Sequence, residues 1–177
     1  MQSKGKTRYV ILGLLNENPM SGYDLKKIID LRFKYFWNES FGQIYPGLEK
    51  LVKEKLVTKA IDRENKKKRY VYSITEKGKS ELLKWLSRPV DTELMRFEIL
   101  LKVYFGNLLE KTDLDKHISA FRSKHTQNLE IIKQFEEELL SIRDMHDNHE
   151  YVLKVILFGK MVYETFIKWS DSYKSET

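Results

Sequence analysis

A predicted helix that runs directly into a predicted β-hairpin limits the folds open to this chain more than any other sequence feature. Residues 40–57 carry apolar side chains at helical spacing, which predicts an amphipathic helix with one buried face: Leu48, Leu51, Val52 and Leu56. Residues 57–61 and 70–74 then alternate in polarity and are joined by a polar segment, as expected for two paired strands. The end of this segment carries four consecutive cations, Lys66, Lys67, Lys68 and Arg69. A helix followed by a cationic hairpin is typical of a winged helix-turn-helix, whose helix enters a DNA groove while its wing contacts phosphates.

The residues around this segment supply the other helices of such a domain. Thr7 precedes an apolar stretch that predicts a first helix. Ser21 and Asp24 have the spacing of a capping box, so they predict the start of a second helix, whose inner face would contain Leu25, Ile28, Ile29 and Phe33. Thr75 is expected to cap a fourth helix, which ends near Pro89.

The start of the third helix has two interpretations. Ser40 and Gln43 repeat the capping-box spacing and predict a start at this point. Pro46 lies only six residues beyond Ser40, and a proline there removes the amide hydrogen bond back to Gly42. Either the first turn is distorted, or the regular helix begins near Ile44.

The sequence therefore predicts a mainly α protein with two domains. Residues 1–88 form the winged helix-turn-helix, with three helices and a two-stranded β-wing, and residues 89–177 form an all-helical dimerisation domain. A capping signal at residues 112–115 precedes a run of residues spaced alternately by three and four, which is the spacing of a coiled-coil seam. We expect the dimer interface to contain Ile118, Phe121, Ile132, Phe135, Leu139, Phe166 and Trp169.

Charge separates the two halves of the chain. Residues 1–90 contain 20 Lys and Arg against 10 Asp and Glu, whereas residues 91–177 contain 12 against 16. The basic half is the candidate for binding a polyanion. The chain has no cysteine, which excludes disulfides and thiolate metal sites. The apolar run at residues 9–15 is too short to cross a bilayer and lacks a signal-peptide cleavage site, so we expect a soluble cytoplasmic protein without membrane contact.

The predicted contacts with double-stranded DNA fall on the third helix and the wing. Early in the helix, Ser40, Gln43 and Tyr45 are candidates for reading bases, because glutamine can pair with adenine through two hydrogen bonds. Lys50 is better placed for a phosphate. In the wing, Lys66, Lys67, Lys68 and Arg69 are expected to bind the DNA backbone or enter the minor groove. Tyr70 and Tyr72 are assigned to the strand core.

The remaining candidate sites carry weaker signals. His125 and Asn128 interrupt the predicted seam, and they either line a ligand pocket or set the helix register; the second interpretation is favoured. His146, His149 and Glu150 would share a face of a helix and offer part of a metal site, but their surroundings favour a loop, so no metal is predicted. Because no cofactor motif or nucleophile constellation is evident, we predict neither a cofactor nor an enzyme.

Several of these motifs resemble the PadR family of bacterial transcriptional regulators. The first helix is similar at residues 9–15, the second at Ser21-Gly-Tyr-Asp-Leu25, and the third at Gly42-Gln-Ile-Tyr-Pro-Gly-Leu48. The returning wing strand and the helix after it are similar at residues 69–78. Residues 36–46 and 97–105, with the aromatic helix through Trp169, resemble the AphA-like branch.

The resemblance implies a homodimer whose paired wings meet a pseudo-palindromic operator. Tyr23, in the second of these motifs, is included among the candidate DNA contacts. Many family members are repressors that small aromatic or hydrophobic effectors release, which is the expectation for this chain. Some AphA-like members instead activate transcription with a partner protein. The alternative class is a winged-helix module that binds another protein, against which the strongly basic first half argues.

Overall fold

The computed structural model describes residues 5–33, 36–37, 39–62, 69–90, 96–142 and 148–175. The chain divides into two compact units, Met1–Thr92 and Glu93–Thr177. The protein is mainly helical, with one two-stranded antiparallel sheet in the described residues, as the sequence predicts. Each unit is described below by itself.

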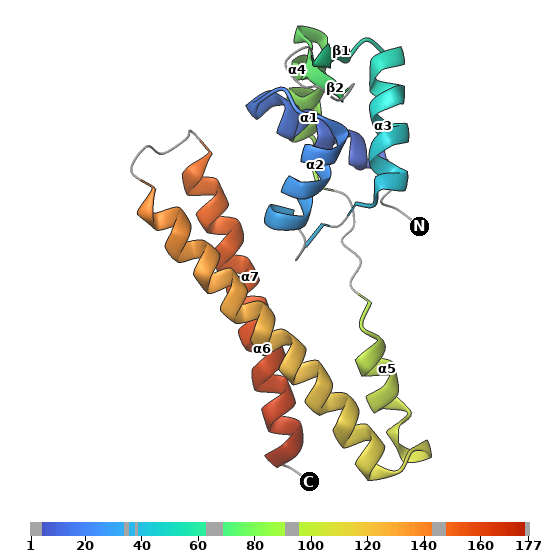
Figure 1. The fold of residues 1–177 in the computed structure, drawn as a ribbon. Helices are drawn as coiled ribbons and strands as arrows, with labels where there is room; N and C mark the ends of the chain where they lie inside the picture. The colour runs from blue at the N-terminus through green and yellow to red at the C-terminus, as the bar shows by residue number, and fades with distance from the viewer. Residues whose placement is uncertain are drawn as a thin grey trace. The chain divides into compact units, whose positions relative to one another are not determined.

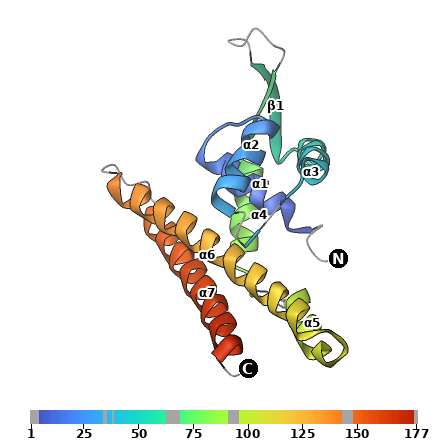
Figure 2. The same cartoon turned by 60° about the horizontal axis from the view of Figure 1, so that its bottom comes forward.

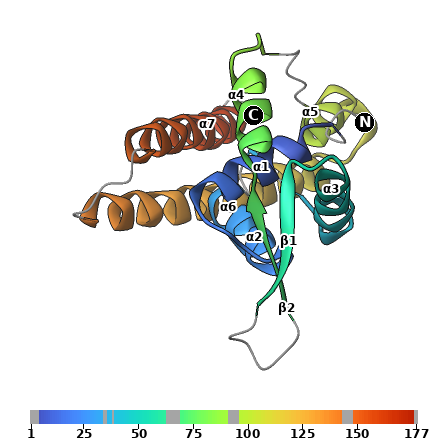
Figure 3. The ribbon, with the colours of Figure 1, turned by 90° about the horizontal axis from the view of Figure 1, so that it is seen from above.

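The first unit consists of short helices and a β-hairpin (Figure 1). Its elements, in chain order, are α1 (Thr7–Glu17), α2 (Gly22–Ile28), the π-helical turn η2 (Ile29–Phe33), α3 (Phe41–Lys53), β1 (Val57–Asp62), β2 (Arg69–Ile74) and α4 (Glu76–Leu86). The strands pair from Val57 opposite Ile74 to Asp62 opposite Arg69. Figure 3 shows this hairpin extending past α2 and α3, which is the arrangement of a wing.

Side-chain caps begin three of these helices at the predicted positions. Ser21 Oγ accepts a hydrogen bond from the Asp24 amide at 3.2 Å, and Asp24 Oδ2 accepts one from the Ser21 amide at 3.1 Å. Ser40 precedes α3, which starts at Phe41, so Pro46 lies inside the helix and the alternative start near Ile44 is wrong. Thr75 Oγ1 caps α4 by accepting from the Gly78 amide at 3.0 Å.

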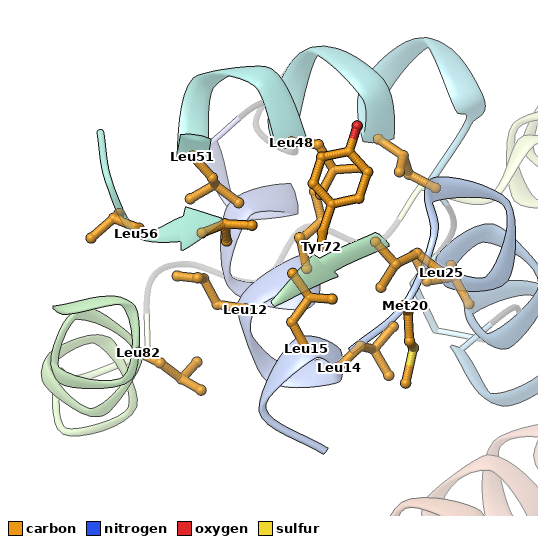
Figure 4. Close-up of a cluster of buried hydrophobic side chains, with 14 residues drawn as sticks. Leu12, Leu14, Leu15, Met20, Leu25, Leu48, Leu51, Leu56, Tyr72 and Leu82 are labelled. Carbon is orange, nitrogen blue, oxygen red and sulfur yellow. The ribbon is translucent and has the colours of Figure 1, made fainter. Parts of the chain in front are cut away.

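One hydrophobic core joins all the elements of the first unit (Figure 4). The buried side chains come from both ends of the unit and from the hairpin, and include Ile11, Leu12, Leu25, Ile29, Ile44, Leu48, Leu51, Val57, Tyr72 and Leu82. The predicted inner faces of α2 and α3 are confirmed, since Ile28, Phe33 and Val52 also pack on this core. Tyr70 differs from the prediction, because it is 40% exposed and only Tyr72 of the two enters the core.

Two sets of contacts hold α3 and the wing in place. A buried carboxylate, Glu39, accepts hydrogen bonds from Thr7 Oγ1 at 2.8 Å and Trp37 Nε1 at 2.7 Å, which ties the approach to α3 to α1. On the other side, Met20 and Tyr72 exchange two backbone hydrogen bonds, at 3.0 Å and 2.9 Å. The segment before α2 is therefore paired to the returning wing strand, and the wing root is fixed relative to α2.

The end of α3 and the start of α4 meet at a tight turn. Lys55 has a φ of 60°, and the Leu56 amide donates to the Leu51 carbonyl at 3.0 Å, which together form a Schellman ending. Thr75 Oγ1 donates to the Leu56 carbonyl at 3.1 Å. A Cβ built on Gly78 would lie 2.2 Å from that same carbonyl oxygen. This approach therefore requires glycine at position 78.

The secondary-structure elements in the described residues of the second unit are all helical. It contains α5 (Glu98–Tyr104), the 3₁₀ turn η3 (Gly106–Leu108), α6 (Lys111–Ser141) and α7 (His149–Ser175). The predicted capping signal at residues 112–115 is wrong as a helix start, because α6 begins at Lys111, after Glu110, without a side-chain cap. Figure 1 shows α6 and α7 side by side. The pairs Arg122–Asp171, at 2.6 Å, and Glu136–Lys160, at 2.5 Å, show that they run antiparallel.

Most of the predicted dimer seam faces α7 of the same chain. Ile118 and Ile132 are buried, and a Cβ on Gly159 would lie 2.5 Å from Ile132 Cδ1. The Phe121 ring lies 5.5 Å from Phe166 and 5.6 Å from Trp169, measured between centroids. Phe135 and Leu139 are half-buried. The seam spacing thus identified the apolar face of α6, and the contacts that the structure places on it are intramolecular.

Membrane-spanning helices and metal-binding clusters are both absent from the described residues. Among the described residues, no helix is both long and apolar enough to cross a bilayer. The same part of the chain contains no cluster of three or more His, Asp or Glu side chains arranged to hold a metal ion. His149 is buried at the start of α7, and His146 lies outside the described residues.

Candidate nucleic-acid interface

The helix α3 lies at one edge of the first unit, with α2 and the wing beside it (Figure 2). Ile44, Leu48 and Leu51 fix the helix on the core, because they are fully or almost fully buried. The residues outside this buried face are exposed and include Tyr45, beside α2, and the predicted phosphate contact Lys50. The first unit thus presents a helix beside a protruding hairpin, as the winged helix-turn-helix prediction requires.

Three exposed aromatic side chains meet at the start of α3. Tyr23 of α2 is 63% exposed, and Phe41 and Tyr45 of α3 are 44% and 45% exposed. The Phe41 ring lies between the other two, with centroids 6.5 Å from Tyr23 and 6.0 Å from Tyr45 and interplanar angles of 16° and 22°. We call Tyr23, Phe41 and Tyr45 the aromatic surface. Sequence reasoning singled out Tyr23 and Tyr45 but missed Phe41, whose position beside the cap gave the only signal.

The two polar candidates for base reading are bonded to each other. Ser40 donates hydrogen bonds from its amide and from its hydroxyl to Oε1 of Gln43, both at 2.9 Å. Both lone pairs of that oxygen are therefore used in capping α3. A two-bond pairing of Gln43 with adenine needs the same oxygen as an acceptor, so it would compete with the cap.

Arg69 occupies the root of the wing and bonds to α2. Its guanidinium forms an ion pair with Asp24 and donates to Ser21 Oγ at 3.0 Å. Burial acts to raise the pKa of Asp24, but the hydrogen bonds from Ser21 and Arg69 and the charge of Arg69 outweigh it and hold the pKa below its usual value of 3.8. The predicted phosphate contact at position 69 is thus also an internal link between the wing and the α2 cap.

A shallow concavity of about 370 Å³ lies between these elements. It is lined by the first turn of α2, by Tyr45 of α3, and by Arg69, Tyr70 and Tyr72 of β2. A Cβ on Gly22 would lie 2.7 Å from the Tyr45 ring, so the absence of a side chain there lets the ring lie against α2. The aromatic ring of Tyr45 is consequently held at the rim of the concavity.

Two lysines lie near the concavity and the aromatic surface. Lys59 of β1 lies 3.9 Å from the centroid of the Tyr70 ring, and Lys26 lies 5.9 Å from that of Phe41. These two lysines were not among the predicted contacts. The predicted wing contacts Lys66, Lys67 and Lys68 lie outside the described residues.

Two family models match successive parts of the chain. Residues 11–84 match the Transcriptional regulator PadR-like family, and residues 95–176 match the model described as virulence activator alpha C-term. The negative transcriptional regulator PadR of Bacillus subtilis is 31% identical over 137 residues, which are 76% of this chain and 75% of that protein.

Solved structures of such regulators resemble the chain over nearly its whole length. Bacillus subtilis PadR in complex with operator DNA matches with a TM-score of 0.82 and 27% identity, covering 96% of this chain and 97% of the other. The same protein in complex with p-coumaric acid matches with a TM-score of 0.76 and 26% identity over 96% of each chain. The Vibrio cholerae virulence activator AphA shares the fold, with a TM-score of 0.76 and 22% identity over 96% of each chain.

Proposed function

We propose, from the premise that this chain belongs to the PadR-like family of transcriptional regulators, that it binds operator DNA sequence-specifically as a cytoplasmic homodimer and represses transcription. Family membership confirms the predictions of a regulator rather than an enzyme and of an AphA-type C-terminal domain. The finer parts of the proposal are the sequence specificity, the dimer, the repression and the release by an effector, and each has its own support.

The observation that most supports DNA binding is the exposed α3 beside a wing in the strongly basic half of the chain. A helix of this size fits the major groove, while the cations around it neutralise phosphates. The similar Bacillus subtilis regulator has been crystallised with operator DNA, and its name describes a negative regulator. Both points favour an operator-binding repressor.

The homodimer is supported by apolar side chains on the second unit that remain exposed after α6 and α7 have paired. On α7 these include Tyr151, Val155 and Phe158, which follow one another at helical spacing along one side. An apolar helix face of this kind is suited to a second copy of the chain. A twofold dimer would present two α3 helices and would match a pseudo-palindromic operator.

Release by a small aromatic or hydrophobic effector is the part of the proposal that rests most on a relative. The Bacillus subtilis protein has been crystallised with p-coumaric acid. We therefore expect a compound of this class to lower the affinity of the present chain for its operator. Titrating such compounds into a preformed complex would measure that release.

Binding to DNA across a salt series tests the central proposal. Fluorescence anisotropy would compare DNA from upstream of the protein's own gene with a scrambled duplex. Reversing the charge of Lys67 and Lys68 should weaken binding to both duplexes and lower the log–log salt slope by about 0.9 for each phosphate that is no longer neutralised. Lys168→Glu, an exposed change on α7, serves as the matched control and should leave both quantities unchanged.

The results separate the function classes. Preferential binding to the upstream fragment at moderate salt would support a sequence-specific regulator. Equal, salt-sensitive binding to both duplexes would contradict sequence specificity. Complete absence of binding would favour the alternative, a winged-helix module that binds another protein.

A further inference from the structure

Hydrogen bonding to bases does not explain the aromatic surface beside the proposed DNA-binding helix. Its three rings lie nearly parallel, and each is between 44% and 63% exposed. The inner face of α3 is filled by Ile44 and Leu48, so Phe41 and Tyr45 lie outside the buried face of the helix. Because Phe41 and Tyr45 are clustered with Tyr23 instead of being exposed singly, the three rings together offer a contiguous surface for a binding contact.

The polar side chains at the start of α3 are already hydrogen-bonded to each other, so we also consider recognition of bases by apolar contacts. Ser40 and Gln43 are engaged in the cap of α3, with Gln43 Oε1 accepting both of the Ser40 hydrogen bonds. Base reading by Gln43 through this oxygen would disturb the start of the same helix. Contacts that need no hydrogen bond avoid this competition.

The charge of the domain around the aromatic surface favours an anionic occupant. Lys59 lies over the Tyr70 ring, whereas Lys26, 5.9 Å from the Phe41 centroid, and Arg69, which lines the adjoining concavity, are paired with Asp30 and Asp24. Residues 1–90 nevertheless carry 20 Lys and Arg against 10 Asp and Glu, and an apolar surface in a basic domain complements a ligand that has apolar groups inside an anionic frame. In the major groove of DNA, the C5-methyl group of thymine is the apolar group that the bases present, and phosphates flank it.

The position of Tyr45 is set by its neighbour on α2. A Cβ on Gly22 would lie 2.7 Å and 3.0 Å from two carbons of the Tyr45 ring and 3.3 Å from Leu48. The ring can therefore lie against α2 only while position 22 has no side chain. This contact makes Gly22 a positioning residue for the aromatic surface.

We propose that Tyr23, Phe41 and Tyr45 contact thymine C5-methyl groups in the major groove, so that each half-site is selected partly by its methyl groups. The inference rests on the proposed function and specifies the chemistry that the DNA must offer. A protein partner at this surface is the competing occupant, and the excess of Lys and Arg in residues 1–90 favours DNA over it.

Replacing thymidine by deoxyuridine tests the inference, since their bases, thymine and uracil, differ only in the C5-methyl group. The full-length protein would first select its preferred duplex from a random double-stranded pool. Each thymine of that duplex is then replaced singly by deoxyuridine, and affinity is measured by anisotropy. At contacted positions we expect affinity to fall about fourfold for each methyl removed, the value for one buried CH₂ group; replacement at distal thymines is the control.

Two variants assign the effect to the aromatic surface. Phe41→Ala should weaken binding to the thymine duplex and remove most of the difference between thymine and deoxyuridine. Gly22→Ala should displace the Tyr45 ring and reduce that difference while Phe41 is retained. Circular dichroism and binding to unrelated DNA would confirm that both variants are folded.

The outcomes distinguish this inference from the function on which it rests. If the pool yields no preferred duplex, both the proposed sequence specificity and the methyl contact are overturned. If a preferred duplex is found but no deoxyuridine replacement changes its affinity, the methyl contact alone is overturned. Unchanged DNA affinity in Phe41→Ala would likewise overturn it and would point to a protein at this surface.

Discussion

Single residues in the first unit matter mainly through close contacts that a sequence pattern does not reveal. Gly13 and Gly78 both lie in helices, yet their surroundings are opposite. A Cβ on Gly13 would meet nothing within 4 Å, whereas one on Gly78 would lie 2.2 Å from the Leu56 carbonyl oxygen. The segment at residues 73–78 thus ends with glycine because α4 packs against the turn between α3 and β1.

These surroundings predict opposite effects of the same substitution. Gly78→Ala should lower the free energy of unfolding by roughly 1–3 kcal/mol, because backbone must move to admit the methyl group. Gly13→Ala should raise it by roughly 0.5–1 kcal/mol, because alanine loses less conformational entropy in a helix. Urea unfolding followed by far-UV circular dichroism would measure both, and equal effects would contradict the packing of α4.

The residue scale is also where sequence reasoning was least complete. The caps at Ser21, Ser40 and Thr75 were predictable, because a hydroxyl at a fixed offset from a helical apolar pattern has a defined hydrogen-bonding role. The link from Arg69 to the α2 cap was not predictable, because it joins residues that are 45 positions apart. A cationic residue beside a run of lysines gave no sign of an internal partner.

At the scale of elements, the spacing of apolar residues located the helices well but did not identify which element packs on each apolar face. The spacing through α6 predicted one apolar face, and the structure packs that face on α7 of the same chain. The same spacing would arise from a partner helix in a second copy, so sequence alone could not choose between the two. The π-helical turn at Ile29–Phe33 was also missed, since its apolar residues fit an ordinary helix.

The exposed apolar side of α7 yields a prediction about assembly. Phe158 is 64% exposed, so Phe158→Asp should leave helicity unchanged. In a twofold dimer the change occurs twice, and it should weaken dimerisation by roughly 3 kcal/mol or more, from the burial value of one phenylalanine per subunit. Light scattering across a dilution series would detect dissociation, with Glu164→Lys as an exposed control on α7. A Phe158→Asp protein that stays dimeric would exclude this side of α7.

At the scale of the whole molecule, the two units differ in chemistry as well as in sequence. The first unit is basic and has one core, and the second is acidic overall, with aromatic rings gathered around an imidazole. His125 lies 4.3 Å from Phe121, 4.7 Å from Phe166 and 5.5 Å from Tyr163, measured between ring centroids. Within the described residues, its buried Nδ1 has no hydrogen-bond partner. This environment matters for the stability of the second unit.

The environment of His125 predicts how stability depends on pH. Burial, and to a smaller extent the charge of Lys124, lowers the pKa of His125 below its usual value of 6.5. The unfolded chain then binds this proton more readily than the folded chain, so stability is fully present above that value and is lost as pH falls toward the folded pKa.

Urea unfolding between about pH 7.5 and 5.5 would measure this dependence, since the range spans the unperturbed histidine pKa. The His125→Phe protein should lose less stability on acidification than the unchanged protein. His117→Gln serves as the control, because it removes another histidine from α6. An identical pH dependence in all three proteins would contradict the assignment to His125.

The fold class and the division into a basic and an acidic half were predictable because both depend on patterns repeated over many residues. The composition of the candidate interface was only partly predictable. Tyr45 and Tyr23 were identified, but Phe41, Lys26 and Lys59 join them only after α2, α3 and β1 are brought together in space. A local sequence pattern contains no information about such neighbours.

The contact between Gly22 and Tyr45 limits the order in which related proteins can diverge. While the tyrosine ring occupies its place, any side chain gained at position 22 must push the ring aside. A lineage that first replaces the tyrosine by a smaller residue opens position 22 to change, whereas a lineage that mutates position 22 first must pass through a displaced ring. Position 22 can therefore gain a side chain without moving this ring only where position 45 carries a smaller residue.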